Sequence, residues 1–469
     1  MTATAPTSEI AHRVADHVKA DPPWDVVGQR ATTFELHLQG TSVELERGPL
    51  TVEGYGLRLF RPRGELLGTG FQASTDLSPE GIRTVVADAE AAARHAEFPA
   101  RTVELPSDGQ GRSRVSILDR ALWEDPPKAI RAYVDALLAA FEDRKGAVPT
   151  FGSVKATLSE LSIANSSGLR VGFPSTFVQF ELGVKAFGGP EGAPPGEYWV
   201  TQTARRLQPK TVARSVDDWC RYAADVRRAV PPPSGDLAVV LPPDVLSGIL
   251  PYVVGYRFSG VARLRKFAPE VGAVVGTDAI TVTDEGDYPW APGSAPYDDE
   301  GTPREKSVLI DHGKVAHLLY DALYASAFAT KSTGSGNRIS FGPPAAIRFS
   351  HRPVPGESTV VVAPGDGGTL EELAESAGDG LLVTQLGWAS PDPVSGSFGG
   401  EVRIGYRIHG GKVAEPVRGG TVGGVVLAPP GQPSLLSRAE TIGSRVELTD
   451  RLVAPPLLVR PLQVAGVSG

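Results

Sequence analysis

The sequence predicts an α+β protein of two domains, an N-terminal α/β sandwich-like domain and a C-terminal, mainly antiparallel β domain with few helices. First, 469 residues are enough for two or three domains of roughly 100–200 residues each. Second, short runs of alternating apolar and polar residues, separated by turn residues, dominate the chain. Third, residues 227–236, RRAVPPPSGD, hold three consecutive prolines through which no helix continues. We therefore expect one domain over residues 1–230 and another over residues 236–469.

The predicted helices share apolar residues spaced three and four positions apart, which places those residues on one helix face. Ser78 precedes Pro79 in the manner of a helix cap followed by a first-turn proline. In chain order the helices are expected over residues 7–20, 79–93, 126–141, 217–228, 243–260 and 320–330.

The predicted strands share the alternation of apolar and polar residues that is typical of a half-buried sheet. Residues 54–74 read as a hairpin with its turn near Pro62 to Gly64, and residues 165–168, Asn-Ser-Ser-Gly, read as another tight turn. In chain order the strand patterns cover residues 32–40, 41–48, 54–74, 150–206, 237–241, 308–319, 358–364, 380–386 and 401–420.

Charge and composition exclude several classes of protein. The formal net charge is −8, from 46 basic and 54 acidic residues, and no basic cluster is present, so we expect no nucleic-acid partner. No run approaches the ~20 apolar residues of a membrane span, and the N-terminal residues lack a secretory pattern. We expect a cytoplasmic protein without a membrane partner. A single cysteine excludes an internal disulfide framework and any all-thiolate zinc site.

The histidines are spaced wrongly for a metal site. A zinc hydrolase helix carries two histidines four residues apart on one face, with a glutamate between them as base. His12 and His17 are five residues apart, which places their side chains about 140° apart around a helix. We expect both to be surface residues. His312 and His317 flank a strand and its turn, and we expect a surface hairpin there.

Other local patterns carry no clear chemistry either. Cys220 has no neighbouring histidine in the sequence to activate it, so we expect a small buried hydrophobic side chain. The acidic run 298–300 lacks the alternating oxygen ligands of a calcium loop, and we expect a solvated turn. Residues 331–338 place a lysine before the glycines, which is the reverse of a phosphate loop, so a glycine-rich helix end is expected. Residue chemistry alone therefore gives no convincing catalytic site.

Taken in order, several segments resemble the TldD/PmbA (TldD/TldE) metallopeptidase family. The resemblance runs from about residue 30 to the C-terminus, and its specificity lies in the order of the motifs. The segments that carry it are Gly54-Tyr55-Gly56-Leu57-Arg58, Asn165-Ser166-Ser167-Gly168, Asp299-Glu300-Gly301-Thr302-Pro303, Ser332-Thr333-Gly334, Asn337-Arg338, Ser395-Gly396 and Pro416-Val417-Arg418-Gly419.

The resemblance implies a two-domain TldD/PmbA-like architecture and a pair of related subunits. In such a pair the TldD-type subunit carries zinc on a helix that reads H-E-x-x-x-H, with a cysteine near its C-terminus. The TldE/PmbA-type subunit lacks this motif. The pair acts as a metallopeptidase on peptides, and relatives hydrolyse other amide bonds.

Residues 249–260, ILPYVVGYRFSG, correspond to the family's metal helix, I-L-H-E-A-V-G-H-x-L-x-G. By this resemblance Pro251 stands at the first histidine, Tyr252 at the glutamate and Tyr256 at the second histidine. A proline inside a helix removes a hydrogen bond and costs ~3 kcal/mol or more, so we expect a kinked or late-starting helix. The motif therefore predicts no metal in this chain. A separate zinc site would need ligands from His312, His317, His351 or a partner.

The function expected from this resemblance is that of the non-metal, TldE/PmbA-like subunit of a heterodimeric zinc peptidase or amidohydrolase. Zinc is expected in a TldD-like partner that carries H-E-x-x-x-H, and no catalytic residue is expected in this chain. The expected substrate is a peptide or a small amide, with natural-product biosynthesis as the setting. Three alternatives stay open: a non-catalytic interaction or regulatory protein, a homodimer without hydrolase activity, and an independent hydrolase with an unrecognised site.

The residues expected to face a substrate cavity all have side chains that form hydrogen bonds. Tyrosine and arginine in particular donate to a substrate carbonyl or carboxylate. Packing as aromatic core is an equal alternative for the two tyrosines, and a helix-ending loop is an alternative for the last three residues. The candidates are Tyr252, Tyr256, Arg257, Thr333, Asn337 and Arg338.

Overall fold

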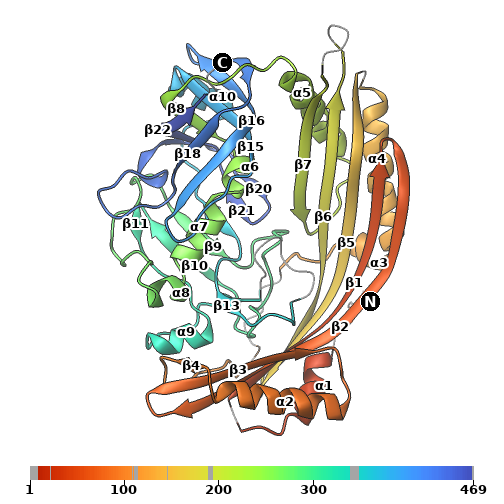
Figure 1. Ribbon diagram of the computed structural model, residues 1–469, viewed down its shortest axis with the longest axis vertical. Coiled ribbons are helices and arrows are strands. Elements are labelled where there is room, and N and C mark those ends of the chain that lie inside the picture. Colours follow the sequence, from red (N-terminus) through yellow and green to blue (C-terminus); the bar gives the residue numbers. More distant parts are fainter. Residues whose placement is uncertain are drawn as a thin grey trace.

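One long curved sheet faces a group of sheets with mostly shorter strands across the molecule (Figure 1). This computed structural model describes residues 9–21, 23–107, 109, 115–144, 146–188, 194–338 and 348–466. Almost all strand pairs are antiparallel, and helices are few in the C-terminal part. The α+β fold class predicted from the sequence is therefore confirmed.

The N-terminal sheet has seven strands in the order β4-β3-β2-β1-β5-β6-β7. Every neighbouring pair in it is antiparallel, and the predicted turn at residues 165–168 connects β5 to β6. The strands are β1 Trp24–Gln39, β2 Ser42–Arg63, β3 Leu66–Ser74, β4 Glu97–Phe98, β5 Ala147–Asn165, β6 Arg170–Ala186 and β7 Gly196–Ala204.

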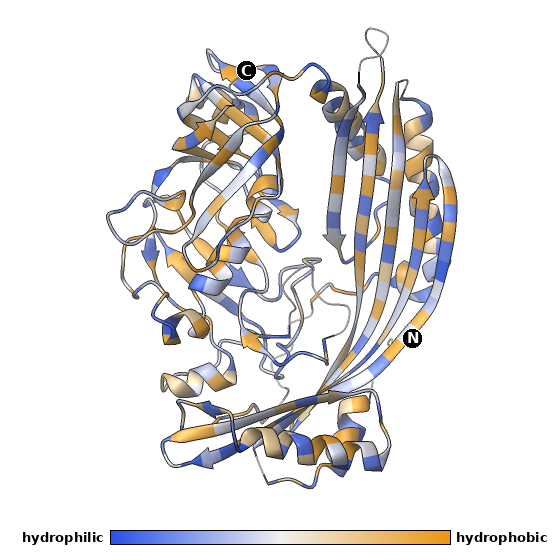
Figure 2. Ribbon diagram, viewed as in Figure 1, coloured by the Kyte–Doolittle hydropathy of each residue, from blue (hydrophilic) through white to orange (hydrophobic). Residues whose placement is uncertain are grey.

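Helices cover one face of this sheet, and the C-terminal half of the chain covers part of the other. Val26, Leu36 and Leu38 lie on one face of β1 and pack in the helix-covered cores, whereas Val27 packs beside residues of the C-terminal half. Figure 2 shows the corresponding alternation of hydrophobic and hydrophilic residues along the long strands. The helices of this half are α1 Ile10–His17, α2 Pro79–Ala93, α3 Arg120–Glu124, α4 Pro126–Glu142 and α5 Val212–Val226.

The predicted start of α2 is confirmed by its cap. The Ser78 hydroxyl oxygen accepts a hydrogen bond from the backbone N–H of Gly81 at 3.0 Å, and Pro79 occupies the first turn. The helix predicted over residues 7–20 is shorter in the structure and extends from Ile10 to His17. Cys220 on α5 is buried as predicted, and burial raises the pKa of its thiol to about 11.

The C-terminal half contains two larger sheets and one short strand pair. Two strand pairs are parallel, β8 with β15 and β14 with β21. One sheet contains β8 Gly235–Leu241, β15 Gly380–Gly387, β16 Ser397–His409, β17 Lys412–Val417, β18 Thr421–Val425, β19 Ala439–Ile442 and β22 Leu457–Ala465. The other contains β9 Val282–Glu285, β10 Lys306–Asp311, β11 Lys314–Val315, β14 Val360–Val362, β20 Glu447–Thr449 and β21 Leu452–Ala454, and the short pair is β12 Gly336–Asn337 with β13 Val354–Pro355.

Short helices lie between these sheets and contribute to the largest core cluster. The single helix predicted over residues 243–260 is wrong as one unit, because this range holds two helices, separated at Gly248, and a third begins only at Gly260. The α-helices of this half are α6 Pro243–Ser247, α7 Leu250–Arg257, α8 Gly260–Leu264, α9 Ala322–Ala327 and α10 Leu370–Ala377.

The boundary between the halves falls in the proline-rich stretch. The N-terminal sheet uses residues 24–204, and the first strand after it begins at Gly235. The predicted domain limits, residues 1–230 and 236–469, stay a prediction. Among the helices that the structure describes, none is long and apolar enough to cross a membrane.

Candidate functional site

Helix α7 carries the segment that resembles a metal helix. It begins at Leu250, so Pro251 lies in its first turn, where a backbone N–H has no intrahelical partner to lose. The predicted late start is confirmed. The buried residues of the helix, among them Val253 and Val254, join the largest core cluster, so α7 is fixed by packing.

A buried ion pair lies against α7. Glu357 Oε1 pairs with Arg451 Nη1 at 2.7 Å, and both side chains are buried. A Cβ atom added at Gly255 would lie 1.7 Å from Glu357 Oε2, so this carboxylate packs where only glycine leaves room. The Arg451 guanidinium carbon is 5.6 Å from the centre of the Tyr252 ring, within cation–π range. Burial raises the pKa of Glu357, and the charge of Arg451 opposes that rise.

The residues at the three motif positions do not fit a zinc ion. Zinc is bound in proteins by thiolate, imidazole and carboxylate groups, none of which Pro251, Tyr252 or Tyr256 supplies. The Arg451 cation beside Tyr252 also repels a second cation at that place. Across the described parts of the chain, no group of three or more His, Cys, Asp and Glu side chains could hold a metal ion.

The other two α7 candidates differ in their surroundings. The Tyr256 hydroxyl is buried and has no hydrogen-bond partner among the described residues. Arg257 Nη1 donates to the backbone carbonyl of Val394 at 2.9 Å, and burial lowers the pKa of its guanidinium. Arg257 thus connects the end of α7 to the loop between β15 and β16.

Thr333 and Asn337, two of the candidates that follow α9, form hydrogen bonds with backbone groups of this chain. Thr333 Oγ1 accepts from the N–H of Tyr320 at 2.9 Å and donates to its carbonyl at 3.1 Å. Asn337 Nδ2 donates to the carbonyls of Gly356 at 2.8 Å and Glu357 at 3.0 Å. Asn337 thus fixes the backbone beside the Glu357–Arg451 pair, whereas Thr333 fixes the backbone just before α9.

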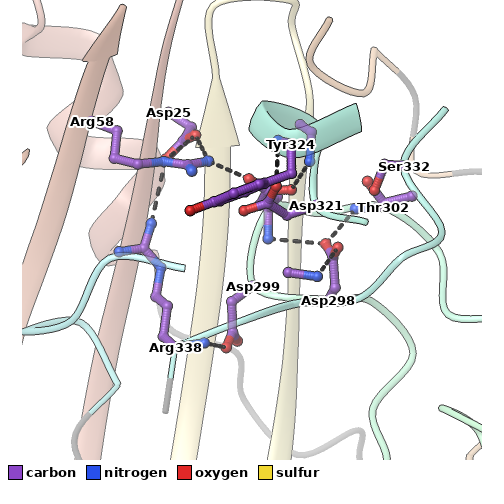
Figure 3. A network of polar contacts seen from close by, with 12 residues as sticks. Asp25, Arg58, Asp298, Asp299, Thr302, Asp321, Tyr324, Ser332 and Arg338 are labelled. Atoms are coloured by element: carbon purple, nitrogen blue, oxygen red, sulfur yellow. Dashed lines mark hydrogen bonds and ion pairs between the residues drawn. The ribbon is translucent and has the colours of Figure 1, made fainter. Parts of the chain in front are cut away.

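Arg338 belongs to a buried ionic network that joins the two halves (Figure 3). Arg58 on β2 pairs with Asp25 on β1 and, at 2.6 Å, with Glu300 of the C-terminal half. Arg338 Nη2 is 3.3 Å from Asp25, and the backbone N–H of Arg338 donates to Asp299 at 2.6 Å. All five side chains are at most 5% exposed, so the network excludes solvent.

The predicted solvated turn at residues 298–300 is therefore wrong. Asp298 accepts three backbone hydrogen bonds, from Glu300, Thr302 and Gly336, and it is completely buried. The acidic run serves an internal contact that a single sequence does not reveal, because Arg58 and Arg348, which pair with Glu300 and Asp299, lie far away along the chain.

Two carboxyl groups in this region have raised pKa values. Burial, together with the negative charge of Glu300, raises the pKa of Asp298 to about 7. The same two causes raise the pKa of Asp321 well above its ordinary value. Glu300 itself pairs with Arg58 at 2.6 Å, which holds it close to both carboxyl groups.

Sequence reasoning missed Glu357 and Arg451, which lie far from α7 in the chain, and it missed the role of Asp25. For Arg58, Asp299 and Glu300 a signal existed, because they belong to the segments that carry the family resemblance. Among the described residues, His312, His317 and His351 belong to no group of three or more His, Cys, Asp and Glu side chains that could hold a metal ion.

Comparison with known proteins identifies a family whose sequences match part of this chain. Residues 234–466 match the family model described as the PmbA/TldA metallopeptidase C-terminal domain. A "Metalloprotease TldD homolog" of Buchnera aphidicola subsp. Schizaphis graminum is 30% identical over 193 residues, 40% of this chain and 38% of that protein. A protein of the same description from Haemophilus influenzae is 28% identical over 197 residues, 41% of this chain and 39% of that protein. The matched stretch thus spans about two fifths of these curated relatives.

Solved structures extend the likeness to the whole fold. TldE from Thermococcus kodakarensis superposes with a TM-score of 0.77 at 21% identity, covering 98% of this chain and 99% of that chain. A Thermotoga maritima protein superposes with a TM-score of 0.78 at 19% identity, covering 97% of this chain and 99% of its own. From its C-terminal sequence match and its full-length fold, this chain belongs to the TldD/PmbA family.

Proposed function

We propose that this chain is the metal-free, TldE/PmbA-like subunit of a two-chain TldD/TldE-type zinc peptidase or amide hydrolase. One observation carries the proposal: Pro251, Tyr252 and Tyr256 occupy the metal-motif positions of α7, and the buried Glu357–Arg451 pair packs against the same helix. The Arg451 guanidinium balances the buried Glu357 carboxylate beside this helix, so that charge needs no metal ion as its partner.

The partner in this proposal is a TldD-like paralogue that carries H-E-x-x-x-H and supplies the zinc and the general base. This chain contributes walls of the substrate cavity and contributes no catalytic group. The substrate class is a peptide or a small amide, and natural-product biosynthesis is the proposed setting. The TldE likeness of the fold and the TldD likeness of the C-terminal sequence support such a pairing.

A peptide substrate of this enzyme would bind in an extended form along a sheet edge, where main-chain hydrogen bonds provide affinity. Strand β7 supports this part of the proposal, because it is an edge strand: it is the last strand of the N-terminal sheet and pairs with β6 on one side.

Co-expression with the TldD-like paralogue of the same organism tests the proposal. We expect a heterodimer on size-exclusion chromatography that hydrolyses a capped fluorogenic peptide, with activity lost when a motif histidine of the paralogue is replaced. This chain alone should be inactive. Hydrolysis by this chain alone that a chelator abolishes would overturn the proposal. Failure of the two chains to associate would also overturn it and favour the regulatory or homodimeric alternative.

A further inference from the structure

A cleft is lined by the start of β5, the end of β6, the start of β7 and parts of β15 and β16. These ends of β5, β6 and β7 lie at the opposite end of the long sheet from β3 and β4 (Figure 1). Its volume is about 590 Å³, within the range of roughly 300–1,000 Å³ that is usual for small-molecule sites. Gln385 Nε2 on β15 donates to the backbone carbonyl of Trp199 on β7 at 2.6 Å. This bond joins the two walls of the cleft directly.

Three aromatic side chains line the cleft and are exposed. Phe151 and Trp199 pack edge to face, with ring centres 6.2 Å apart, and are 44% and 50% exposed. Trp388 on the opposite wall is 79% exposed. Burial of such large rings is strongly favourable, so three exposed rings around one cleft indicate a surface that binds something.

Trp388 also has an unusual backbone conformation. Its φ angle is +55°, in the left-handed region that residues other than glycine rarely adopt. The conformation places Trp388 between this cleft and a second hollow of about 610 Å³, and the residue lines both. Strain of this kind persists only where the surrounding structure imposes it.

The loop that follows Trp388 is held by several hydrogen bonds. Asp392 accepts from the N–H of Val394 at 2.8 Å, and the N–H of Gly396 donates to the Asp392 carbonyl at 2.8 Å. Arg257 donates to the Val394 carbonyl from the end of α7. The loop after Trp388 is thus held in place, which reduces the backbone entropy that is lost when a ligand binds beside it.

The charged side chains of the cleft are mostly paired. Lys185 pairs with Glu197 at 2.8 Å, and Arg403 lies 3.5 Å from Glu401. The cleft therefore offers ring faces and a polar rim to an uncharged group.

We infer that this cleft is a binding site for an aromatic side chain of a peptide, which packs against Trp388 and the Phe151–Trp199 pair. The inference stands apart from the proposed metal-free role, because it concerns binding by this chain alone. Aromatic rings pack well in the offset or edge-to-face arrangements that such walls provide.

A capped pentapeptide, Ala-Ala-(4-fluorophenylalanine)-Ala-Ala, is the probe, and fluorine NMR line broadening with the full chain is the readout. We expect saturable binding that the unlabelled phenylalanine peptide displaces and that the matched leucine peptide displaces at least tenfold less well. Trp388→Ala and Trp199→Ala should each raise Kd at least tenfold, whereas Trp388→Phe retains most of the affinity. Phe187→Ala is the matched control, because Phe187 is an exposed aromatic residue that is not among the residues lining the cleft.

Absence of saturable binding, equal displacement by the leucine peptide, or unchanged Kd in both tryptophan-to-alanine variants would overturn the inference. An equal loss in the Phe187→Ala control would do the same. None of these results bears on the zinc content of the chain, so failure here is distinguishable from failure of the proposed function.

Discussion

The two halves of the molecule meet in two different ways along one face of strand β1. Near its start, Asp25 enters a solvent-free network with Arg58 and Arg338. At its end, Gln39 lines an open cleft with exposed aromatic walls. Since these residues share one face of one strand, the difference comes from what the C-terminal half presents to it. The ionic network at the start of β1 fixes the halves together, whereas the cleft at the end of β1 leaves a space large enough for a ligand.

The largest expected loss of stability comes from a substitution in the buried ionic network at the start of β1. Arg58→Ala leaves the carboxylates of Asp25 and Glu300 buried without their shared partner. Removing one member of a buried ion pair costs about 3–5 kcal/mol, so the free energy of unfolding from urea titration should fall by that amount.

The matched control for Arg58→Ala is Arg30→Ala. Arg30 also pairs with a carboxylate of the neighbouring strand, Glu53, but it is about half exposed. Exposed pairs contribute about 0–1 kcal/mol. Equal losses in the two variants would contradict the claim that the buried network fixes the halves together.

The contrast also shows what the sequence could and could not predict. Periodicity predicted α2 and α4 and the hairpin turns, because these depend on neighbours in the chain. It failed for the acidic run 298–300, whose environment depends on Arg58, some 240 residues away along the chain. The same holds for Glu357 against Gly255, since packing between distant segments leaves no periodic signal.

A smaller loss of stability is expected from a substitution in α7, where Gly255 is in steric contact with Glu357. Gly255→Ala would place a methyl group against the Glu357 carboxylate and disturb its pair with Arg451. Overpacking of this kind costs about 1–3 kcal/mol, to be measured as a loss of unfolding free energy. Gly248→Ala is the control, because the nearest atom to an added Cβ there is 3.7 Å away. A neutral Gly255→Ala would mean that the ion pair is not packed on α7.

The smallest expected effect is a pH dependence of stability that arises from Asp298. The Asp298 pKa of about 7 lies above the ordinary value of 3.8, so the folded protein binds this proton more tightly than the unfolded chain does. Stability from this group is therefore present at low pH and falls as the pH rises from about 4 to about 7. We expect the melting temperature to decrease between pH 5 and pH 8, and to decrease less in Asp298→Asn.

Asp311→Asn is the control for that measurement, because Asp311 is exposed on the surface. Identical pH profiles for Asp298→Asn and the unaltered protein would show that Asp298 does not take up this proton.

The most direct test of the central claim is the zinc content of the purified chain, measured by atomic emission with and without the TldD-like paralogue. A metal-free subunit predicts substoichiometric zinc in this chain alone and stoichiometric zinc in the pair. Stoichiometric zinc in this chain alone, retained through gel filtration, would contradict the account, because α7 and the Glu357–Arg451 pair would then not have replaced a metal site.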